Sequence, residues 1–141
     1  MKIYLDTCCY NRPFDDQNQV KIELESTAKL YIQNKIYEGE YDLVWSFMLD
    51  YENNDNPYED RRENIQIWEN IATEFCDLAR EVLEQGKKLQ KLGIKENDAL
   101  HMSCAIFTKC SYFLTTDYKL TNRDLDKIKI VNPIEFIKIM E

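Results

Sequence analysis

The stretch KIYLD, residues Lys2–Asp6, is a short apolar run that is followed directly by an acidic residue. A second stretch of the same kind, YFLTTD at Tyr112–Asp117, lies near the other end of the chain. Short apolar runs like these are typical of strands that are buried on both faces in a parallel sheet. Since the carboxyl ends of parallel strands lie along one edge, Asp6 and Asp117 are expected to meet there.

Segments with strand and helix periodicity alternate between and around these two stretches. The remaining regular segments are predicted to be strands at 41–47 and 128–131 and helices at 20–38, 60–73, 76–92, 98–109 and from Asn132 onward. Segment 7–18 is expected to be a loop, Gly39 to end the helix before it, and Asn97 to cap the buried helix over 98–109. This alternation predicts an α/β fold, a three-layer α/β/α sandwich around a mostly parallel sheet.

The length and composition of the chain predict one folded domain over residues 1–141, which is enough for a single hydrophobic core. No apolar run is long enough to span a membrane, and the first run is too short for a signal peptide. No membrane contact is therefore expected, and the cytoplasm is the predicted location. The five cysteines are an odd number without a secretory signal, so they are predicted to be free thiols that pack as small apolar side chains.

The net charge of −8 constrains the function. Taken alone, it argues against binding to nucleic acid, whose backbone is also negative. Half of this charge comes from four acids that are candidates for one site, and bound divalent ions would offset it locally. The net charge therefore counts against a nucleic-acid partner without excluding one.

The four candidate acids each lie at the end of a strand or near the start of a helix: Asp6, Glu52, Asp98 and Asp117. Carboxylates gathered at one edge repel one another, and a divalent cation is the usual compensation. Hard oxygen ligands suit Mg²⁺ or Mn²⁺. The chain has one histidine and no convincing serine or cysteine nucleophile with a partnered base, which disfavours covalent catalysis and favours a metal-activated water.

Four segments, in this order along the chain, resemble the signature segments of PIN-domain nucleases. They are KIYLDT at 2–7, SFMLDYE at 46–52, NDALH at 97–101 and YFLTTD at 112–117. The resemblance covers nearly the whole chain. Each motif is short, but four in the family's order and spacing are specific.

The resemblance implies a metal-dependent ribonuclease with a parallel sheet of four or five strands. It also implies a toxin of a bacterial toxin–antitoxin pair, with an antitoxin protein as partner, RNA as substrate, and a homodimer. Carried over residue by residue, Asp6, Glu52, Asp98 and Asp117 are the expected catalytic acids and the ligands of Mg²⁺ or Mn²⁺. Thr116 is the expected polar neighbour of this site.

The chain departs from the family pattern in two respects. Many relatives have a further acid shortly after the last motif, whereas residues 118–120 here are Tyr, Lys and Leu, and Asp124 lies further on. The second segment offers two acids, Asp50 and Glu52. The spacing from Ser46 favours Glu52, and the choice stays open at this point.

Thr7, Arg12, Thr116 and His101 are the candidate substrate-binding residues. His101 lies three residues after Asp98, on the same helical face, where it would contact a substrate phosphate, orient Asp98, or serve as a hydrogen-bonded, partly buried residue. Arg12 lies just beyond Asp6, where it would clamp a phosphate or remain solvated.

Three functions remain in competition. The first is a Mg²⁺/Mn²⁺-dependent endoribonuclease, and the alternative is a catalytically silent PIN-fold module that binds RNA or protein. A third, a phospho-acceptor domain, requires a lysine over the acidic pocket, for which Lys119 is the available residue. Self-association is expected through the amphipathic helices at 60–73 and 76–92, with Trp45 or Trp68 near the interface. The apolar surface behind this expectation is formed by Ile65, Ile67, Trp68 and Ile71.

Overall fold

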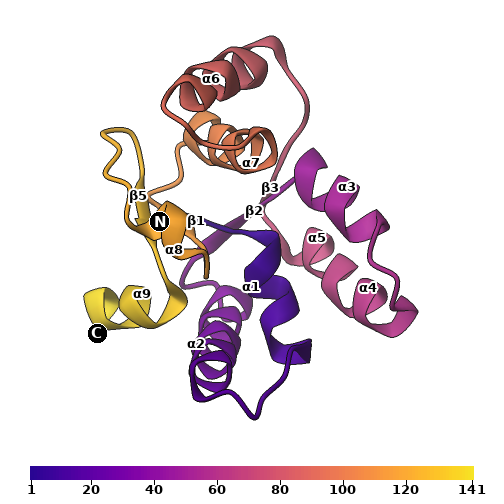
Figure 1. Ribbon diagram of the computed structural model, residues 1–141. Helices are drawn as coiled ribbons and strands as arrows, with labels where there is room; N and C mark the ends of the chain where they lie inside the picture. The colour runs from indigo at the N-terminus through magenta and orange to yellow at the C-terminus, as the bar shows by residue number, and fades with distance from the viewer.

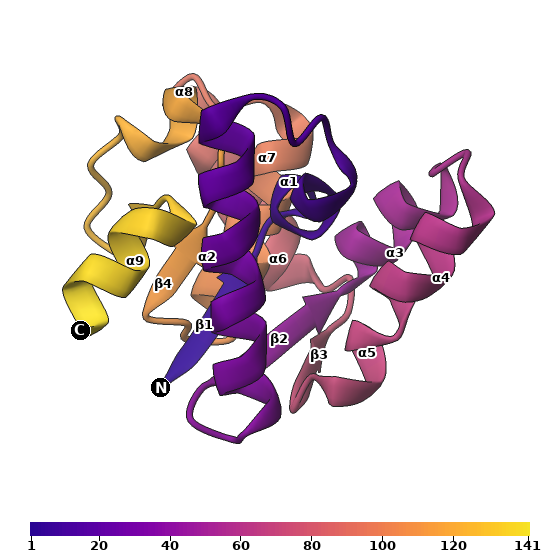
Figure 2. The ribbon, with the colours of Figure 1, turned by 90° about the horizontal axis from the view of Figure 1, so that it is seen from below.

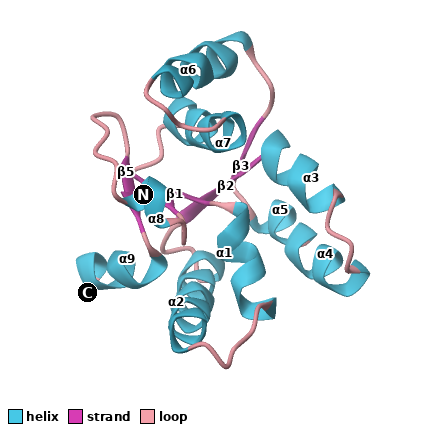
Figure 3. Ribbon diagram, viewed as in Figure 1, coloured by secondary structure: helices cyan, strands magenta, loops and turns pink.

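Five parallel strands form one sheet in the order β3-β2-β1-β4-β5, in a computed structural model that describes residues 1–141 (Figure 1, Figure 3). The strands are β1 (Lys2–Leu5), β2 (Asp42–Ser46), β3 (Glu74–Cys76), β4 (Tyr112–Leu114) and β5 (Lys129–Val131). The central strand, β1, pairs with β2 and β4, and Tyr4 lies in register with Val44 and Phe113. The predicted parallel sheet is confirmed, and it has five strands.

Helices cover both faces of this sheet. They are α1 (Thr7–Asn11), the 3₁₀ helix η1 (Arg12–Phe14), α2 (Val20–Tyr37), α3 (Phe47–Asn54), α4 (Glu59–Gln66), α5 (Trp68–Ile71), α6 (Arg80–Lys91), α7 (Glu96–Phe107), α8 (Tyr118–Thr121) and α9 (Pro133–Met140). Helices α6 and α7 lie on one face and α1, α2 and α9 on the other, while α3, α4 and α5 extend beyond β2 and β3 (Figures 1 and 2). The predicted three-layer α/β/α sandwich is confirmed.

The core explains why the strands are apolar without alternation. Ile3, Tyr4 and Leu5 are all fully buried, because helices remove both faces of β1 from water. Successive strand residues point to opposite faces, so Tyr4 and Asp6 share the face that is covered by α7. Asp6, which directly follows β1, therefore lies on the same face as the buried Tyr4.

The segment 7–18 was expected to be a loop, and this is wrong for residues 7–14. Residues Thr7–Asn11 form α1 and Arg12–Phe14 form η1. Asp6 caps α1 by accepting a hydrogen bond from the Thr7 amide (2.8 Å), and Pro13 lies in the first turn of η1. Asp and Pro are common both in loops and at helix starts, so their presence alone does not separate the two.

Two further boundaries differ from the sequence prediction. The helix expected over 76–92 begins only at Arg80, because Glu74–Cys76 pairs with β2 as the edge strand β3. The helix expected over 60–73 is divided into α4 and α5, and α8 was not predicted. An edge strand of three residues is too short to show a periodicity of its own, which is why it was missed.

The capping predictions have mixed outcomes. Asn132 caps α9 as expected, accepting from the Ile134 amide (2.8 Å), and Gly39 follows α2 with a left-handed φ of 85°. The predicted cap of α7 at Asn97 is wrong, since the helix begins earlier and its cap residue, Lys95, makes no side-chain hydrogen bond.

Most of the apolar side chains that were expected to form a surface on the helix at 60–73 are packed into the core instead. Trp45 is fully buried and Ile65 is nearly so, so neither lies at a surface, and the prediction for Trp45 is wrong. Trp68 and Ile71 pack against the core, which leaves Ile67 as the exposed apolar residue. No helix in the structure is both long enough and apolar enough to cross a membrane.

Asn53 joins the helix that carries Glu52 to the helix that follows. Its side chain is buried, and Nδ2 donates to the Arg62 carbonyl (3.0 Å) and to Oε1 of Gln66 (2.9 Å). Replacing it leaves two partly buried acceptors without this donor, which costs about 1–3 kcal/mol.

We expect Asn53→Ala to lower the free energy of unfolding by about 1–3 kcal/mol in a urea titration. Asn54→Ala is the matched control, because Asn54 is exposed in the same helix, and its effect should stay within about 0.5 kcal/mol. Equal effects of the two substitutions would show that the bonds of Asn53 do not hold α3 to α4.

Candidate active site

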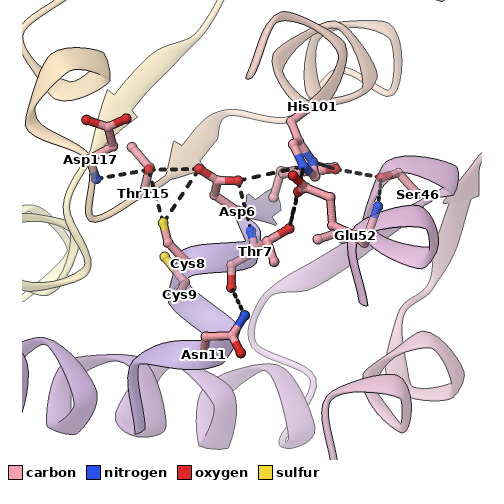
Figure 4. Close-up of polar contacts among 12 residues, drawn as sticks. Asp6, Thr7, Cys8, Cys9, Asn11, Ser46, Glu52, His101, Thr115 and Asp117 are labelled. Carbon is pink, nitrogen blue, oxygen red and sulfur yellow. Dashed lines mark hydrogen bonds and ion pairs between the residues drawn. The ribbon is translucent and has the colours of Figure 1, made fainter. Parts of the chain in front are cut away.

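Asp6 stands at the carboxyl end of the central strand and is held from both sides. Its backbone amide donates to the Leu114 carbonyl (2.9 Å), which continues the pairing of β1 with β4. Oδ1 accepts from the Thr7 amide, and Oδ2 accepts from Oγ1 of Thr115 (2.9 Å) (Figure 4). Only 6% of Asp6 is exposed, so this carboxylate is both rigid and largely removed from water.

Glu52 reaches the same place from α3. This helix begins after Ser46, whose hydroxyl accepts from the Leu49 amide as the helix cap. The Glu52 Oε1 accepts from Oγ1 of Thr7 (2.6 Å) and forms a close ion pair with Nε2 of His101. The cap of α3 therefore sets the direction from which Glu52 enters.

The other acid of this segment, Asp50, faces elsewhere. Its Oδ1 accepts from Nε1 of Trp45 and from Nε2 of Gln66, both at 2.8 Å. Asp50 therefore fixes a buried indole and the following helix, whereas Glu52 joins the acidic group. This geometry agrees with the preference for Glu52 from its spacing.

His101 is buried and closes the group from α7. Its Nε2 faces Glu52 and lies 3.8 Å from Oδ1 of Asp6. Its Nδ1 lies 2.6 Å from the Tyr4 hydroxyl, which in turn lies 2.6 Å from Oγ of Ser46. Of the roles considered for His101, a buried hydrogen-bonded residue agrees with the structure, and its partner is Glu52 rather than Asp98.

The pKa values of this group follow from burial and pairing. Burial opposes the charged imidazolium, but the hydrogen bond to Glu52 and the charges of Asp6 and Glu52 outweigh it and raise the pKa of His101. Burial also acts to raise the pKa of Glu52, but the bonds from His101 and Thr7 bring it below its ordinary value. Burial raises the pKa of the Tyr4 hydroxyl well above its ordinary value, so Tyr4 keeps its proton.

Asp98 and Asp117 stand beside this group rather than within it. Asp98 lies in the first turn of α7, and Asp117 caps α8 by accepting from the Lys119 amide (2.9 Å). The two acids line one cavity of about 170 Å³, together with Lys95, Lys119 and Arg123. The structure thus brings Asp98 and Asp117 together at the same sheet edge as Asp6.

Burial, and then the negative charges of Asp6 and Asp117, raise the pKa of Asp98 above its ordinary value. A carboxyl group with a raised pKa in the folded state binds its proton more tightly there than in the unfolded chain. Ionised Asp98 therefore opposes folding at neutral pH, and this penalty disappears as the pH falls below the ordinary range of Asp.

A metal fits part of this arrangement. Asp6, Glu52 and His101 each offer a ligand atom, and these atoms lie within 4.8 Å of one another. Carboxylate oxygens suit Mg²⁺ and Mn²⁺, while an imidazole nitrogen is a softer ligand. The Tyr4 and Glu52 contacts occupy both ring nitrogens of His101, so the carboxylates are the available donors for a hard cation.

Some of the predicted substrate-binding residues lie in the acidic group and others do not. Thr7 lies in the group, where it bonds Glu52. Arg12 does not, because its guanidinium donates to Glu25 (3.0 Å) and to Asp15 (3.1 Å). Thr116 is buried beside the site, but its neighbour Thr115 is the residue whose hydroxyl bonds Asp6.

Tyr4, Ser46, Thr115 and Cys8 were not predicted as site residues. The thiol of Cys8 lies 3.6 Å from Oδ2 of Asp6 and 3.3 Å from Oγ1 of Thr115, and all five cysteines are free thiols as expected. One signal was available for Tyr4, because residues two apart in a strand share a face and Tyr4 precedes Asp6 by two. The others depend on contacts between distant segments.

Comparison with solved structures identifies the fold. A chain of the crystal structure of VapBC2 from Rickettsia felis, bound to a DNA fragment from its promoter, matches with a TM-score of 0.60 and 17% identity, over 94% of this chain and 98% of that one. A chain of the 2.2 Å structure of VapBC-1 from nontypeable Haemophilus influenzae matches with a TM-score of 0.55 and 18% identity over the same shares. The chain has the PIN-domain fold. No family model and no curated protein sequence matches it.

The crowding of acids on this PIN fold has a testable effect on stability. We expect Asp98→Asn to raise the melting temperature by a few degrees at pH 7.5 in EDTA, because it removes the penalty of ionising Asp98. The difference from wild type should shrink as the pH falls below 4, where Asp98 is protonated in both states.

Glu96→Gln is the control for this melt, because Glu96 is an exposed acid in the same first turn of α7. It should not raise the melting temperature. If Asp98→Asn instead lowers it at neutral pH, Asp98 is a helix-stabilising residue of the first turn and not a strained site acid.

Proposed function

We propose that the protein is a metal-dependent endoribonuclease that hydrolyses RNA phosphodiesters with a water molecule activated by Mg²⁺ or Mn²⁺. The observation that carries this proposal is the gathering of acids from β1, α3, α7 and the end of β4 at one edge of the sheet. The match of the fold to chains of two VapBC structures supports it.

In this proposal Asp6, Glu52, Asp98 and Asp117 hold the metal and form the catalytic set. The ion supplies charge neutralisation at the phosphate and lowers the pKa of a bound water. Asp6 is suited to its role by rigidity, since its two oxygens are fixed by Thr7 and Thr115.

His101 is proposed to act as a positioning residue for Glu52. The protonated Nε2 of His101 donates a hydrogen bond to Oε1 of Glu52, and the Thr7 hydroxyl donates to the same oxygen. Tyr4 keeps its proton because of burial, and it holds the other ring nitrogen in place. His101, Thr7 and Tyr4 together orient the Glu52 carboxylate without using its second oxygen.

The substrate proposal rests on the cations around the cavity of Asp98 and Asp117. Lys95, Lys119 and Arg123 line that cavity, and none of them forms an ion pair, although Arg123 donates to a backbone carbonyl. Three unpaired cations beside two site acids provide a local positive rim on a chain of net charge −8. Such a rim suits the phosphates of RNA on either side of the bond to be cleaved.

An antitoxin partner is proposed from the same structural likeness, because both matched structures are VapBC assemblies. We further propose that residues 1–141 act as one nuclease domain in the cytoplasm, where RNA substrate is available, and that the protein forms a homodimer. The exposed Ile67 on the α4–α5 segment is what remains of the predicted dimer surface.

The competing function is a catalytically silent PIN-fold module that binds RNA or protein. The observation that favours it is the absence of an acid directly after Asp117, where Lys119 lines the acidic cavity instead. A lysine in that position is also what the phospho-acceptor reading requires. Cleavage of RNA separates the nuclease from both.

We expect the purified protein to cleave RNA with Mg²⁺ or Mn²⁺ and not in EDTA. Asp6→Asn and Glu52→Gln should each lower the rate by about 100-fold or more per folded molecule. Asp50→Asn is the matched control and should retain most activity, because Asp50 bonds Trp45 and Gln66 instead of the acidic group. Cleavage that persists in EDTA and in Asp6→Asn would overturn the proposed mechanism.

The cationic rim is tested by RNA binding in an Asp6→Asn background, which separates affinity from cleavage. Lys119→Ala should weaken binding and reduce the slope of log K against log salt by about 0.7, the value for one lost phosphate contact on a single strand. Lys87→Ala, which removes an exposed lysine of α6, should change neither. An unchanged slope for Lys119→Ala would remove Lys119 from the substrate site.

A further inference from the structure

A second cavity, apart from the acidic group, is lined by residues of α1, η1, α2, α4 and α5. Its volume is about 150 Å³. Its walls include the aromatic rings of Tyr10, Phe14 and Trp68, and its polar lining includes Lys29 and Gln33. None of these residues belongs to the proposed nuclease site.

Lys29 is buried without a partner of opposite charge. Only 4% of the residue is exposed, and its ammonium group makes no hydrogen bond or ion pair. The groups that face it are the ring of Tyr10, at 5.3 Å, and Cys9, and burial raises the pKa of both well above their ordinary values, so both are neutral. Burial in turn lowers the pKa of Lys29 to about 7.

The nearest acid along the helix does not serve Lys29. Glu25 lies one turn earlier in α2 and is fully buried, but its carboxylate accepts from Arg12 (3.0 Å) and from Asn132. Buried charges in proteins are normally paired, so an unpaired lysine that lines a cavity is unusual.

Two more residues of this lining carry a buried polar atom without a partner. The Tyr10 hydroxyl and Nε2 of Gln33 are both removed from solvent, and neither has a hydrogen-bond partner. Most buried polar atoms in folded proteins are satisfied, so these two groups, beside a lysine without a counter-charge, mark this lining as suited to a hydrogen-bond acceptor that carries negative charge. Water would serve the hydroxyl and the amide, but it would not balance the charge of Lys29.

We propose that this cavity binds a small aromatic carboxylate. A carboxylate accepts hydrogen bonds only and carries the charge that Lys29 lacks, and Gln33 and Tyr10 offer further donors. The aromatic and aliphatic walls suit a ring, and a cavity of about 150 Å³ holds a ligand the size of benzene. The ring of the ligand would lie against the aromatic walls, and its carboxylate would lie beside Lys29.

Benzoate is the probe, and benzyl alcohol, which has the same ring and no charge, is the matched ligand. Titration is followed by NMR at pH 6 in EDTA, so that binding of carboxylate to a metal is excluded. We expect benzoate to shift the indole N–H of Trp68 and the side-chain amide of Gln33, and benzyl alcohol to bind at least tenfold more weakly.

Lys29→Met should weaken benzoate binding at least tenfold while the protein stays folded, because the substitution removes a buried amine that lacks a partner. Gln33→Met is the second variant and should weaken binding by a smaller factor. Asp6→Asn, in the acidic site, should bind benzoate as wild type does, which separates this cavity from the nuclease proposal.

The protonation of Lys29 provides an independent readout. The residues that face it from α1 are neutral, and those from α4 and α5 (Asn64, Ile65 and Trp68) do not ionise. With a pKa of about 7, Lys29 is charged at pH 6 and mostly neutral at pH 8, so benzoate affinity should fall about tenfold between them. No binding of benzoate, equal binding of benzyl alcohol, or equal binding to Lys29→Met would each overturn the proposal.

Discussion

The buried carboxylate of Asp6 is the constraint on which the candidate site depends. An ionised carboxylate that is almost removed from water must be hydrogen-bonded, and here its two oxygens are bonded by the Thr7 amide and the Thr115 hydroxyl. These bonds join the end of β1 to the start of α1 and to the end of β4. Any change in that junction moves the Asp6 carboxylate, so the chemistry of the site depends on the geometry of the sheet edge.

The charge distribution is compatible with the RNA substrate that we propose for this acidic chain. Several acids lie close together at the sheet edge. Burial, and then the charges of Asp6 and Asp117, raise the pKa of Asp98. Around the same cavity stand Lys119 and two further unpaired cations. Net charge describes the whole surface, whereas an encounter with a phosphate depends on the local field at the site. A value of −8 for the chain therefore leaves such a site possible.

Two buried bases make an instructive contrast. Both ring nitrogens of His101 have a hydrogen-bond partner, Tyr4 at Nδ1 and Glu52 at Nε2. The pKa of His101 is raised because the effect of the nearby carboxylates is larger than the opposing effect of burial. Lys29 has no partner, and burial alone lowers its pKa. A satisfied base holds its neighbours in place, while an unsatisfied one in a cavity leaves binding energy available to an anion. By the same physical rule, His101 has a role inside the protein, and Lys29 fits the carboxylate ligand that we propose.

The sequence by itself determined the α/β class, the parallel sheet and the acids at the ends of its strands, because periodicity and the order of elements are local properties of the chain. It did not determine the edge strand β3, the caps of α7, or which of Asp50 and Glu52 faces the acidic group. Nor did it reveal the Tyr4–His101 contact or the burial of Lys29 without an acidic partner. Each of these depends on which surfaces meet when distant segments pack, and only the tertiary structure decides that.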